Sequence, residues 1–256
     1  MNSAETIISE NERKVEVCYS PALFPVYYSS NNCVVVVIDI FRASSAIVTA
    51  FEHGVKSVIP VATTTEALEY KSQGYLVGAE RQGEIVQGFD FGNSPFSYMN
   101  GNLRDKEVVL TTTNGTKAIH RASAADKVIV GSFLNLTAVC DYLESLNKDV
   151  LLLCAGWRNR YNLEDSLFAG AVVEKLSQNS IFSGLSDSAI AAKYLYNSAK
   201  EDMNAFLKIS SHRKRLMRLN LEKDIEYCLQ LDTTAVIPEF IGNSLVEHVQ
   251  VKSKIH

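Results

Sequence analysis

Short apolar runs recur along the chain, and the first of them, VVVVI at 34–38, contains no polar position. A run of β-branched residues without polar alternation is typical of a strand buried on both faces, as central strands of parallel sheets are. Further strands are predicted at 55–62, 74–80, 108–112, 127–131 and 149–153. Because most of these runs lead into a small polar loop and then into apolar residues at helical spacing, the pattern predicts parallel βα units in an α/β protein.

The remaining segments favour a single domain over residues 1–256. Residues 81–101 contain several glycines and a proline, which predicts an ordered loop that crosses the sheet. Residues 187–220 are predicted to be mainly helical, and TTAVIPEF at 233–240 resembles a final strand. No repeat of fixed period and no Pro/Ser-rich linker marks a second domain, and the polar residues 1–14 are expected to be flexible.

Composition narrows the class of protein. Hydrophobic residues make up 46% of the 256 residues, enough for a sizeable core, yet no window of about 18 uninterrupted apolar residues predicts a membrane span. The polar start lacks a secretory signal, so we expect a cytoplasmic protein. Five widely spaced cysteines without a CxxC pair argue against disulfides and structural zinc. The net charge of −4 argues against general nucleic-acid binding but leaves room for a local anion pocket.

Asp39 and Arg42 directly follow the apolar run at 34–38. Ligand crevices of open α/β sheets lie beyond the carboxyl ends of the strands, so this charged pair is predicted to belong to a functional site. An arginine there can bind an anion with two parallel hydrogen bonds. The alternative is that the two residues form a structural ion pair with each other.

Two loops at the same predicted sheet edge have the composition of anion sites. In TTTNGTKAI and GSFLN, hydroxyl groups and backbone N–H groups converge at the start of a helix, which suits a phosphate or a sulfonate. Ordinary helix capping is the alternative for each loop. The predicted anion-binding residues of these loops are Thr112, Thr113, Asn114, Gly115, Thr116, Ser132 and Asn135.

Carboxylates also gather at the predicted strand ends. Asp39 and Glu80 each end a strand, and Glu164 with Asp165 opens a helix. Oxygen ligands from separate loops suit Mg²⁺, which usually takes one or two carboxylates together with waters and substrate oxygens. We therefore expect Asp39, Glu80 and Asp165 to be the candidate Mg²⁺ ligands, with helix-dipole complementarity as the alternative role of the pair at 164–165.

Three other features have simpler interpretations. The basic run SSHRKRLMRLN at 210–220 has no interleaved aromatic residues, so a solvated helix face is expected rather than a nucleic-acid site. His212 within it has no visible partner and is expected to be structural, although a role as general acid or base stays open. Cys154 is expected to be a small buried residue at a strand end.

Six ordered segments resemble the signature blocks of the 2-phosphosulfolactate phosphatase (ComB) family. They are DIFRASSAIVTAFEHG, GAERQGEIVQGFDFGNSP, LTTTNGTKAI, VGSFLN, CAGWRNRYNLEDSLFAGA and DIEYCLQLD, spread over residues 34–238. The resemblance implies a three-layer α/β/α fold with a largely parallel sheet that can include antiparallel strands. It further implies an enzyme that uses Mg²⁺ to hydrolyse (2R)-2-phospho-3-sulfolactate to (2R)-3-sulfolactate and phosphate, a step of coenzyme M biosynthesis.

Carried onto this chain, the family blocks fall on the residues already singled out and on several more. Asp39 and Arg42 become the expected catalytic residues. The additional residues expected to bind substrate are Arg81, Asn93, Ser94 and Arg158. The chain departs from the family pattern at residues 157–160, where WRNR replaces a smaller loop richer in glycine, and at Arg213, where glycine is expected.

The residues leave several functional questions open. Asp39 could attack phosphorus itself or could position a water. The substrate could be another phosphorylated hydroxy acid, or the anion loops could belong to a protein that binds without catalysis. The partner expected in each case is a small phosphorylated anion, with neither nucleic acid nor membrane involved. A homodimer is a base-rate expectation for an enzyme of this size.

Overall fold

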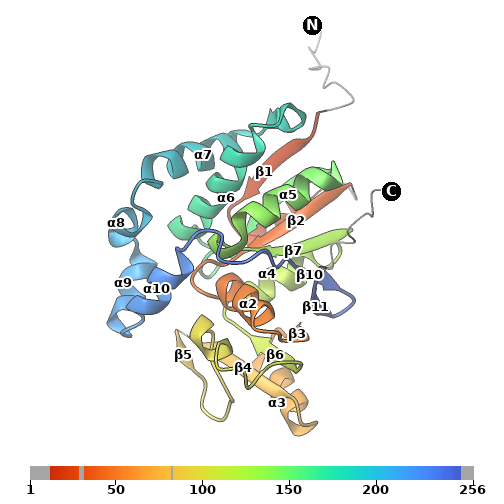
Figure 1. The fold of residues 1–256 in the computed structure, drawn as a ribbon, viewed down its shortest axis with the longest axis vertical. Coiled ribbons are helices and arrows are strands. Elements are labelled where there is room, and N and C mark those ends of the chain that lie inside the picture. Colours follow the sequence, from red (N-terminus) through yellow and green to blue (C-terminus); the bar gives the residue numbers. More distant parts are fainter. Residues whose placement is uncertain (1–11, 29–31, 82, 249–256) are drawn as a thin grey trace, which may run out of the picture.

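The computed structural model describes residues 12–28, 32–81 and 83–248, and these form an α/β fold around one mixed sheet (Figure 1). Its eleven strands lie in the order β5-β4-β6-β3-β11-β10-β7-β2-β8-β1-β9. The strands are β1 (Lys14–Cys18), β2 (Cys33–Ile38), β3 (Ser57–Pro60), β4 (Leu76–Arg81), β5 (Glu84–Ile85), β6 (Glu107–Thr111), β7 (Lys127–Gly131), β8 (Asp149–Cys154), β9 (Gly184–Leu185), β10 (Pro238–Ile241) and β11 (Ser244–Glu247).

The sheet consists of two parallel parts joined by an antiparallel hairpin. Strands β4, β6 and β3 pair in parallel on one side, and β7, β2, β8, β1 and β9 pair in parallel on the other. The hairpin β10–β11 lies between them, with β10 antiparallel to β7 and β11 antiparallel to β3. The prediction of a largely parallel sheet with some antiparallel strands is confirmed.

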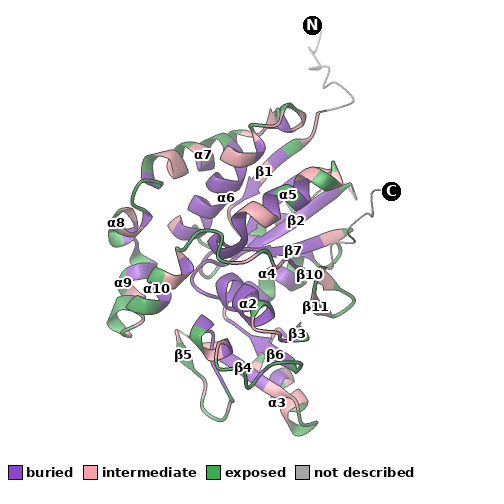
Figure 2. Cartoon of the chain, viewed as in Figure 1, coloured by how far each residue is buried: buried purple, intermediate pink, exposed green. Residues whose placement is uncertain are grey.

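Helices cover both faces of the sheet, which accounts for the unbroken apolar run in β2. Val34, Val36 and Ile38 pack in a core with residues of α5 and α6, whereas Val35 and Val37 pack in a second core with residues of α2 and α4. Figure 2 shows the resulting buried strands between the layers. The helices are α1 (Phe24–Tyr27), α2 (Ala43–Glu52), α3 (Thr64–Ser72), α4 (Gly115–Ala122), α5 (Leu136–Leu146), α6 (Leu163–Leu176), α7 (Asp187–Ala199), α8 (Met203–Phe206), α9 (Ser211–Arg218) and α10 (Glu222–Cys228).

Two segments differ in detail from the sequence prediction. Most of the 1–14 segment lies outside the described residues, but Lys14 begins strand β1, which pairs with β8 and which the sequence analysis did not anticipate. The 81–101 segment holds β5 and a short 3-10 helix at Pro95–Tyr98, and Phe91 in its middle packs directly on Gly78 of β4. Over the ranges that the structure describes, no helix is both long enough and apolar enough to cross a bilayer.

Candidate active site

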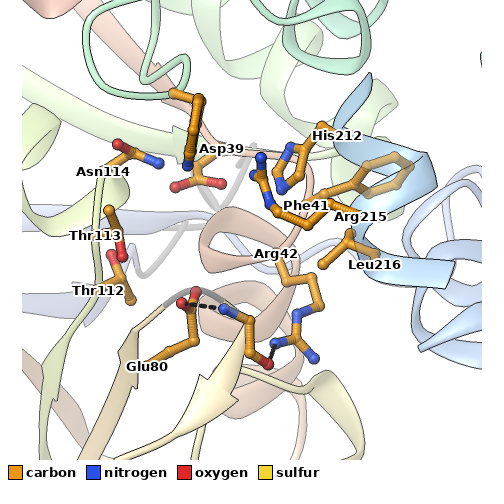
Figure 3. Close-up of a pocket in the computed structure, with 12 residues that line it drawn as sticks. Asp39, Phe41, Arg42, Glu80, Thr112, Thr113, Asn114, His212, Arg215 and Leu216 are labelled. Carbon is orange, nitrogen blue, oxygen red and sulfur yellow. Dashed lines mark hydrogen bonds between the residues drawn. The ribbon is translucent and has the colours of Figure 1, made fainter. Parts of the chain in front are cut away.

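A pocket opens at the carboxyl ends of β2, β4 and β6, and the loop after β8 and helix α9 complete its wall. Its empty volume is about 380 Å³, with the open solvent at its mouth included. Figure 3 shows Asp39 between two groups of side chains, with Thr112, Thr113 and Asn114 on one side and His212 and Arg215 on the other. The lining residues are Asp39, Phe41, Arg42, Glu80, Gly83, Thr112, Thr113, Asn114, Trp157, His212, Arg215 and Leu216.

Asp39 lies at the end of β2 with its backbone held by Ser44. Its N–H donates to Ser44 Oγ (2.7 Å), and its carbonyl accepts from the Ser44 N–H (2.8 Å). The residue is only 7% exposed. Burial raises the pKa of Asp39 to about 7, and the negative charges of Glu80 and Glu164 act in the same direction against the opposing charge of His212. A carboxylate in this position gains from any cation that enters the pocket.

The loop between β6 and α4 forms the wall beside Asp39. Thr112 N–H donates to Thr116 Oγ1 (3.2 Å), and Thr116 N–H donates to Thr112 Oγ1 (3.1 Å), so the two threonines hold the turn closed. The Thr113 hydroxyl is buried and has no hydrogen-bond partner in the described part of the chain. Asn114 Oδ1 accepts from the Arg158 N–H (3.1 Å), which ties this loop to the loop after β8. The unpartnered Thr113 hydroxyl is therefore the group of this loop most available to a ligand.

Gly115 allows the loop to approach Asp39 closely. A Cβ atom at residue 115 would lie 2.8 Å from Asp39 Oδ2 and 2.5 Å from the Ala43 Cβ. Gly115 also begins α4, whose N-terminal backbone N–H groups favour a negative charge. The absence of a side chain thus brings the start of the helix against the carboxylate.

Arg42 is held by a partner that the sequence analysis did not identify. Its Nη1 donates to Asp224 Oδ1 of α10 (2.7 Å) and its Nη2 donates to the Gly83 carbonyl (2.8 Å). Both ionic side chains are buried, at 3% and 8% exposed. Arg42 is therefore not paired with Asp39. Its side chain lines the pocket (Figure 3), and its guanidinium is held by Asp224 and by the Gly83 carbonyl.

Helix α9 contributes more to the pocket than its sequence indicated. The expectation of a solvated face over residues 210–220 is wrong for its first half, because His212, Arg213 and Leu216 are buried. Arg215 reaches the pocket, where its guanidinium carbon lies 4.3 Å from the ring centroid of Trp157. These residues were missed because nothing in the local sequence shows that this helix folds back over the strand ends.

A second guanidinium group packs on the indole ring of Trp157, so two positive charges lie against one ring. The guanidinium carbon of Arg158 is 4.7 Å from the same ring centroid. Burial lowers the pKa of Arg215, and the neighbouring charge of Arg158 adds to this, while Glu164 and Glu80 oppose it. The stack of Arg158, Trp157 and Arg215 gives the pocket mouth a positive potential that suits an anionic ligand.

Comparison with known proteins identifies the family. The family model described as 2-phosphosulpholactate phosphatase matches residues 18–243. Proteins of Thermotoga petrophila and Thermotoga maritima, both described as probable 2-phosphosulfolactate phosphatases, are 44% identical over 211 residues, which is 82% of this chain and 90% of each relative. A protein of Clostridium acetobutylicum with the same description is 37% identical over 219 residues, covering 84% of this chain and 92% of the relative.

This chain belongs to the 2-phosphosulfolactate phosphatase family. The fold and the order of the signature segments agree with that membership, and the family is one of phosphoric monoester hydrolases. All six segments that carried the resemblance in the sequence lie inside the span of the family match or overlap it.

Within this family member, the structure brings only some of the predicted site residues to the pocket. Asp39, Arg42, Glu80, Thr112, Thr113 and Asn114 line it, and Gly115 and Arg158 contact lining residues. Thr116 acts through the Thr112 turn described above. The remaining predicted residues lie behind this first layer, engaged with other parts of the chain.

Asp165 is one of these residues. Its Oδ1 accepts from the Ile40 N–H and its Oδ2 from the Gly156 N–H, each at 2.9 Å, so the carboxylate joins the loops after β2 and β8. Burial raises the pKa of Asp165 well above its usual value, and the charges of Asp39 and Glu164 contribute to the rise. With one backbone donor on each oxygen, Asp165 is placed to hold the loop of Asp39 in position.

The other outlying residues also bind the protein itself. Arg81 donates to the Glu80 carbonyl and to Thr111 Oγ1. Asn135 accepts from the Ser132 N–H and donates to the Val236 carbonyl. Among the described residues, Asn93 Oδ1 and Ser132 Oγ are buried without a hydrogen-bond partner, and Ser94 precedes the 3-10 helix at 95–98. None of these five side chains lines the pocket, so their predicted contacts with substrate stay predictions.

The donor set can accommodate a hard cation only in part. In the portion of the chain that the structure describes, no group of three or more His, Cys, Asp or Glu side chains is arranged to hold a metal ion. Asp39 and Glu80 both line the pocket, however, and their mutual repulsion contributes to the raised pKa of Asp39. Glu80 Oε1 accepts from the Gly83 N–H, which leaves its second oxygen available. Two carboxylates with waters and substrate oxygens are a set that Mg²⁺ accepts.

Proposed function

We propose that this protein is a Mg²⁺-dependent phosphatase that hydrolyses (2R)-2-phospho-3-sulfolactate to (2R)-3-sulfolactate and phosphate. The observation that carries the proposal is Asp39, a buried carboxylate at the end of β2 that faces a small polar pocket beside the start of α4. Family membership supports the reaction class, and the description of the relatives as probable 2-phosphosulfolactate phosphatases supports the substrate.

The pocket has separate places for the negative groups of such a substrate. The Thr113 hydroxyl and the Asn114 amide border Asp39, where a phosphoryl group would lie in reach of the carboxylate. Arg215 and Arg158, stacked on Trp157, border the mouth, where a sulfonate or carboxylate would lie. Arg42 lies on the same wall with its orientation held by Asp224. The polar groups beside Asp39 and the arginine side chains together support binding of a compact, highly charged anion.

Asp39 is the proposed reacting group, with Glu80 beside it as the second carboxylate of the cation site. When bound, Mg²⁺ would neutralise the charge of the phosphoryl oxygens. Asp39 then either attacks the phosphorus in line or positions the water that attacks it. Borohydride reduction during turnover distinguishes the two cases, because an acyl phosphate at Asp39 is converted to homoserine and is visible as a mass change in the peptide that contains residue 39.

The test of the proposal is phosphate release from a panel of phosphorylated hydroxy acids. The panel contains 2-phosphosulfolactate, 2-phospholactate and 3-phosphoglycerate, each assayed with Mg²⁺ and again after chelation. We expect release from the sulfonated compound, loss of release on chelation, and no release by Asp39→Asn. Asp90→Asn is the matched control, because Asp90 pairs with Lys71 away from the pocket.

Each other outcome refutes a defined part of the proposal. Release that survives chelation would remove the metal, and retained turnover in Asp39→Asn would remove Asp39 as the reacting group. Preference for 2-phospholactate would replace the substrate, an alternative favoured by the Trp157–Arg158 departure from the family loop. Binding of the compounds without any phosphate release would favour a non-catalytic anion-binding protein.

A further inference from the structure

His212 and Glu164 form a buried pair in the pocket wall that the reaction described above does not use. His212 lies in the first turn of α9 and lines the pocket, and its Nδ1 is 2.5 Å from Glu164 Oε1 in the first turn of α6. The two residues are 48 positions apart in the chain. The first turns of α6 and α9 therefore bring a carboxylate behind a histidine at the site.

The environment of Glu164 indicates that it serves the histidine. Its side chain is 0% exposed and its Oε1 forms a hydrogen bond with His212, while within the described residues its Oε2 has no hydrogen-bond partner. A buried carboxylate held by a single partner is costly, whereas a pair kept only for stability would satisfy both oxygens. The same carboxylate contributes to the charge that surrounds Asp39. Glu164 is thus placed for its effect on the site rather than for packing.

The pair also determines which ring nitrogen of His212 is available. A carboxylate accepts hydrogen bonds, so the contact with Glu164 places a proton on Nδ1. The amide of Asn162 approaches the same nitrogen only at 3.5 Å, and the ring of Phe41 contacts the imidazole edge-on with centroids 6.1 Å apart. With Nδ1 occupied and the ring orientation restrained, Nε2 is the nitrogen left to exchange a proton with a ligand in the pocket.

We propose that His212 is the general acid that protonates the leaving oxygen during phosphate ester hydrolysis, with Glu164 as the residue that positions it. The proposal rests on the proposed phosphatase function. A hydroxy acid is a poor leaving group when it departs as an alkoxide, so a proton delivered as the bond breaks lowers the barrier. An aspartate behind a histidine has the same orienting role in hydrolases with a Ser-His-Asp triad.

The proton balance of the step closes for either role of Asp39. As the bond from phosphorus to the ester oxygen breaks, its electron pair stays on that oxygen, which takes the Nε2 proton of the imidazolium. In the route through an acyl phosphate at Asp39, the hydrolysing water enters from the side that the leaving group has vacated, and the neutral Nε2 accepts its proton as its oxygen bonds to phosphorus. In the direct route, Asp39 accepts the proton of the attacking water, passes it to solvent, and His212 regains its proton from solvent. The products are the hydroxy acid and phosphate, and His212 returns to its starting form while Glu164 keeps its hydrogen bond to Nδ1 throughout.

The decisive experiment varies the leaving group. Purified wild-type protein and variants are assayed with 2-phosphosulfolactate and with its 3,3-difluoro analogue, whose leaving alkoxide is the weaker base. The variants are His212→Asn, which retains a hydrogen-bond donor near the Nδ1 position but lacks Nε2, and Glu164→Gln. Matched controls are His120→Asn on the exposed end of α4 and Glu174→Gln on the outer part of α6. Thermal unfolding of each variant verifies that it is folded.

General acid catalysis predicts a specific pattern of rate constants. With the natural leaving group, His212→Asn is expected to lose kcat by about 10² to 10⁴-fold. Glu164→Gln is expected to lose about 10 to 100-fold, as expected for a residue that orients another. With the difluoro analogue both losses shrink by about tenfold or more, because a weaker base needs less protonation. The control variants behave as wild type with both substrates.

Three outcomes overturn the proposal in distinguishable ways. Equal losses with both leaving groups would make the pair structural or substrate-binding, and full activity of His212→Asn would remove the histidine from the reaction. In both cases the phosphatase function would still stand. No phosphate release by the wild-type protein from these two compounds or from any other compound of the panel would refute the phosphatase function, and the proposed role of His212 and Glu164 with it.

Discussion

In the metal-free protein, the stability of the Asp39→Asn variant relative to the wild type should increase as the pH rises. Burial raises the folded-state pKa of Asp39 to about 7, from 3.8 for an ordinary aspartate. A carboxyl group whose pKa is raised by folding contributes its full stability below the unfolded-state pKa, and this contribution is lost as the pH rises through the folded-state value. Between pH 5 and pH 7 this carboxyl group is therefore ionised in the unfolded wild-type protein but still largely protonated in the folded protein, and the resulting loss of stability is absent from the Asn variant.

The size of the effect follows from that pKa shift. Each pH unit in this window changes the free energy of unfolding by about 1.4 kcal/mol for one proton, so from pH 5 to pH 8 the wild type should lose about 2 to 3 kcal/mol relative to Asp39→Asn. Urea unfolding of both proteins with a chelator present, at half-unit pH steps, measures this difference. Comparing differences at each pH removes any constant effect of exchanging a carboxylate for an amide.

The Asp90→Asn variant is the control for the direction of this pH dependence. Although partial burial opposes the effect, hydrogen bonds from Lys71 and Val77 hold the pKa of Asp90 below its ordinary value. Asp90 is therefore ionised in both states above pH 5, and its replacement should change stability by the same amount across the window. If the difference in the free energy of unfolding between wild type and Asp39→Asn does not depend on pH, the conclusion that burial raises the pKa of Asp39 is refuted.

Three further predictions follow from the site and the core. Gly115→Ala should lower kcat by about 100-fold with little change in the circular dichroism spectrum, because the new methyl group displaces Asp39 by contact; an unchanged kcat would contradict the close approach. Asp224→Ala should lower the free energy of unfolding by about 3 to 5 kcal/mol in urea, since Arg42 is left buried without its charged partner; a loss below about 1 kcal/mol would match a surface pair instead. All five cysteines are buried, so a thiol reagent should label none of them in the native protein at pH 8 and five in urea, and fast native labelling would contradict the core packing.

Features encoded in a continuous segment were predictable from the sequence. The unbroken run VVVVI identifies β2 because both faces of the strand are buried, and Asp39 stands out as the first charge after it. The turn at TNGT was recognisable from its residue types. Two of its residues, Thr113 and Asn114, line the pocket, and Gly115 lies against Asp39. In β1 the alternation in KVEVC is too short to distinguish a strand from a polar connection, and only pairing with β8 decides it.

Features that depend on distant contacts were not predictable. The sequence offers the near neighbour Asp39 as a possible ion-pair partner of Arg42, whereas in the structure the partner is Asp224, which is 182 positions away. His212 looked isolated because its partner Glu164 lies 48 positions away in the chain, in the first turn of α6. Charge and composition of residues 210–220 describe a solvated helix, and only the fold shows that this helix turns one side toward the strand ends.

The position of the β10–β11 hairpin has a consequence for how the chain is made. These strands follow all other described strands in the sequence, yet they fill the gap between β3 and β7 in the middle of the sheet. A chain emerging from the ribosome can form both parallel parts before residues 238–247 exist. During that interval β3 and β7 each present an open strand edge, which is the surface that promotes aggregation. Completion of the sheet thus has to wait until residues 238–247 have been synthesised, and translation speed over that part of the message should influence how much protein folds.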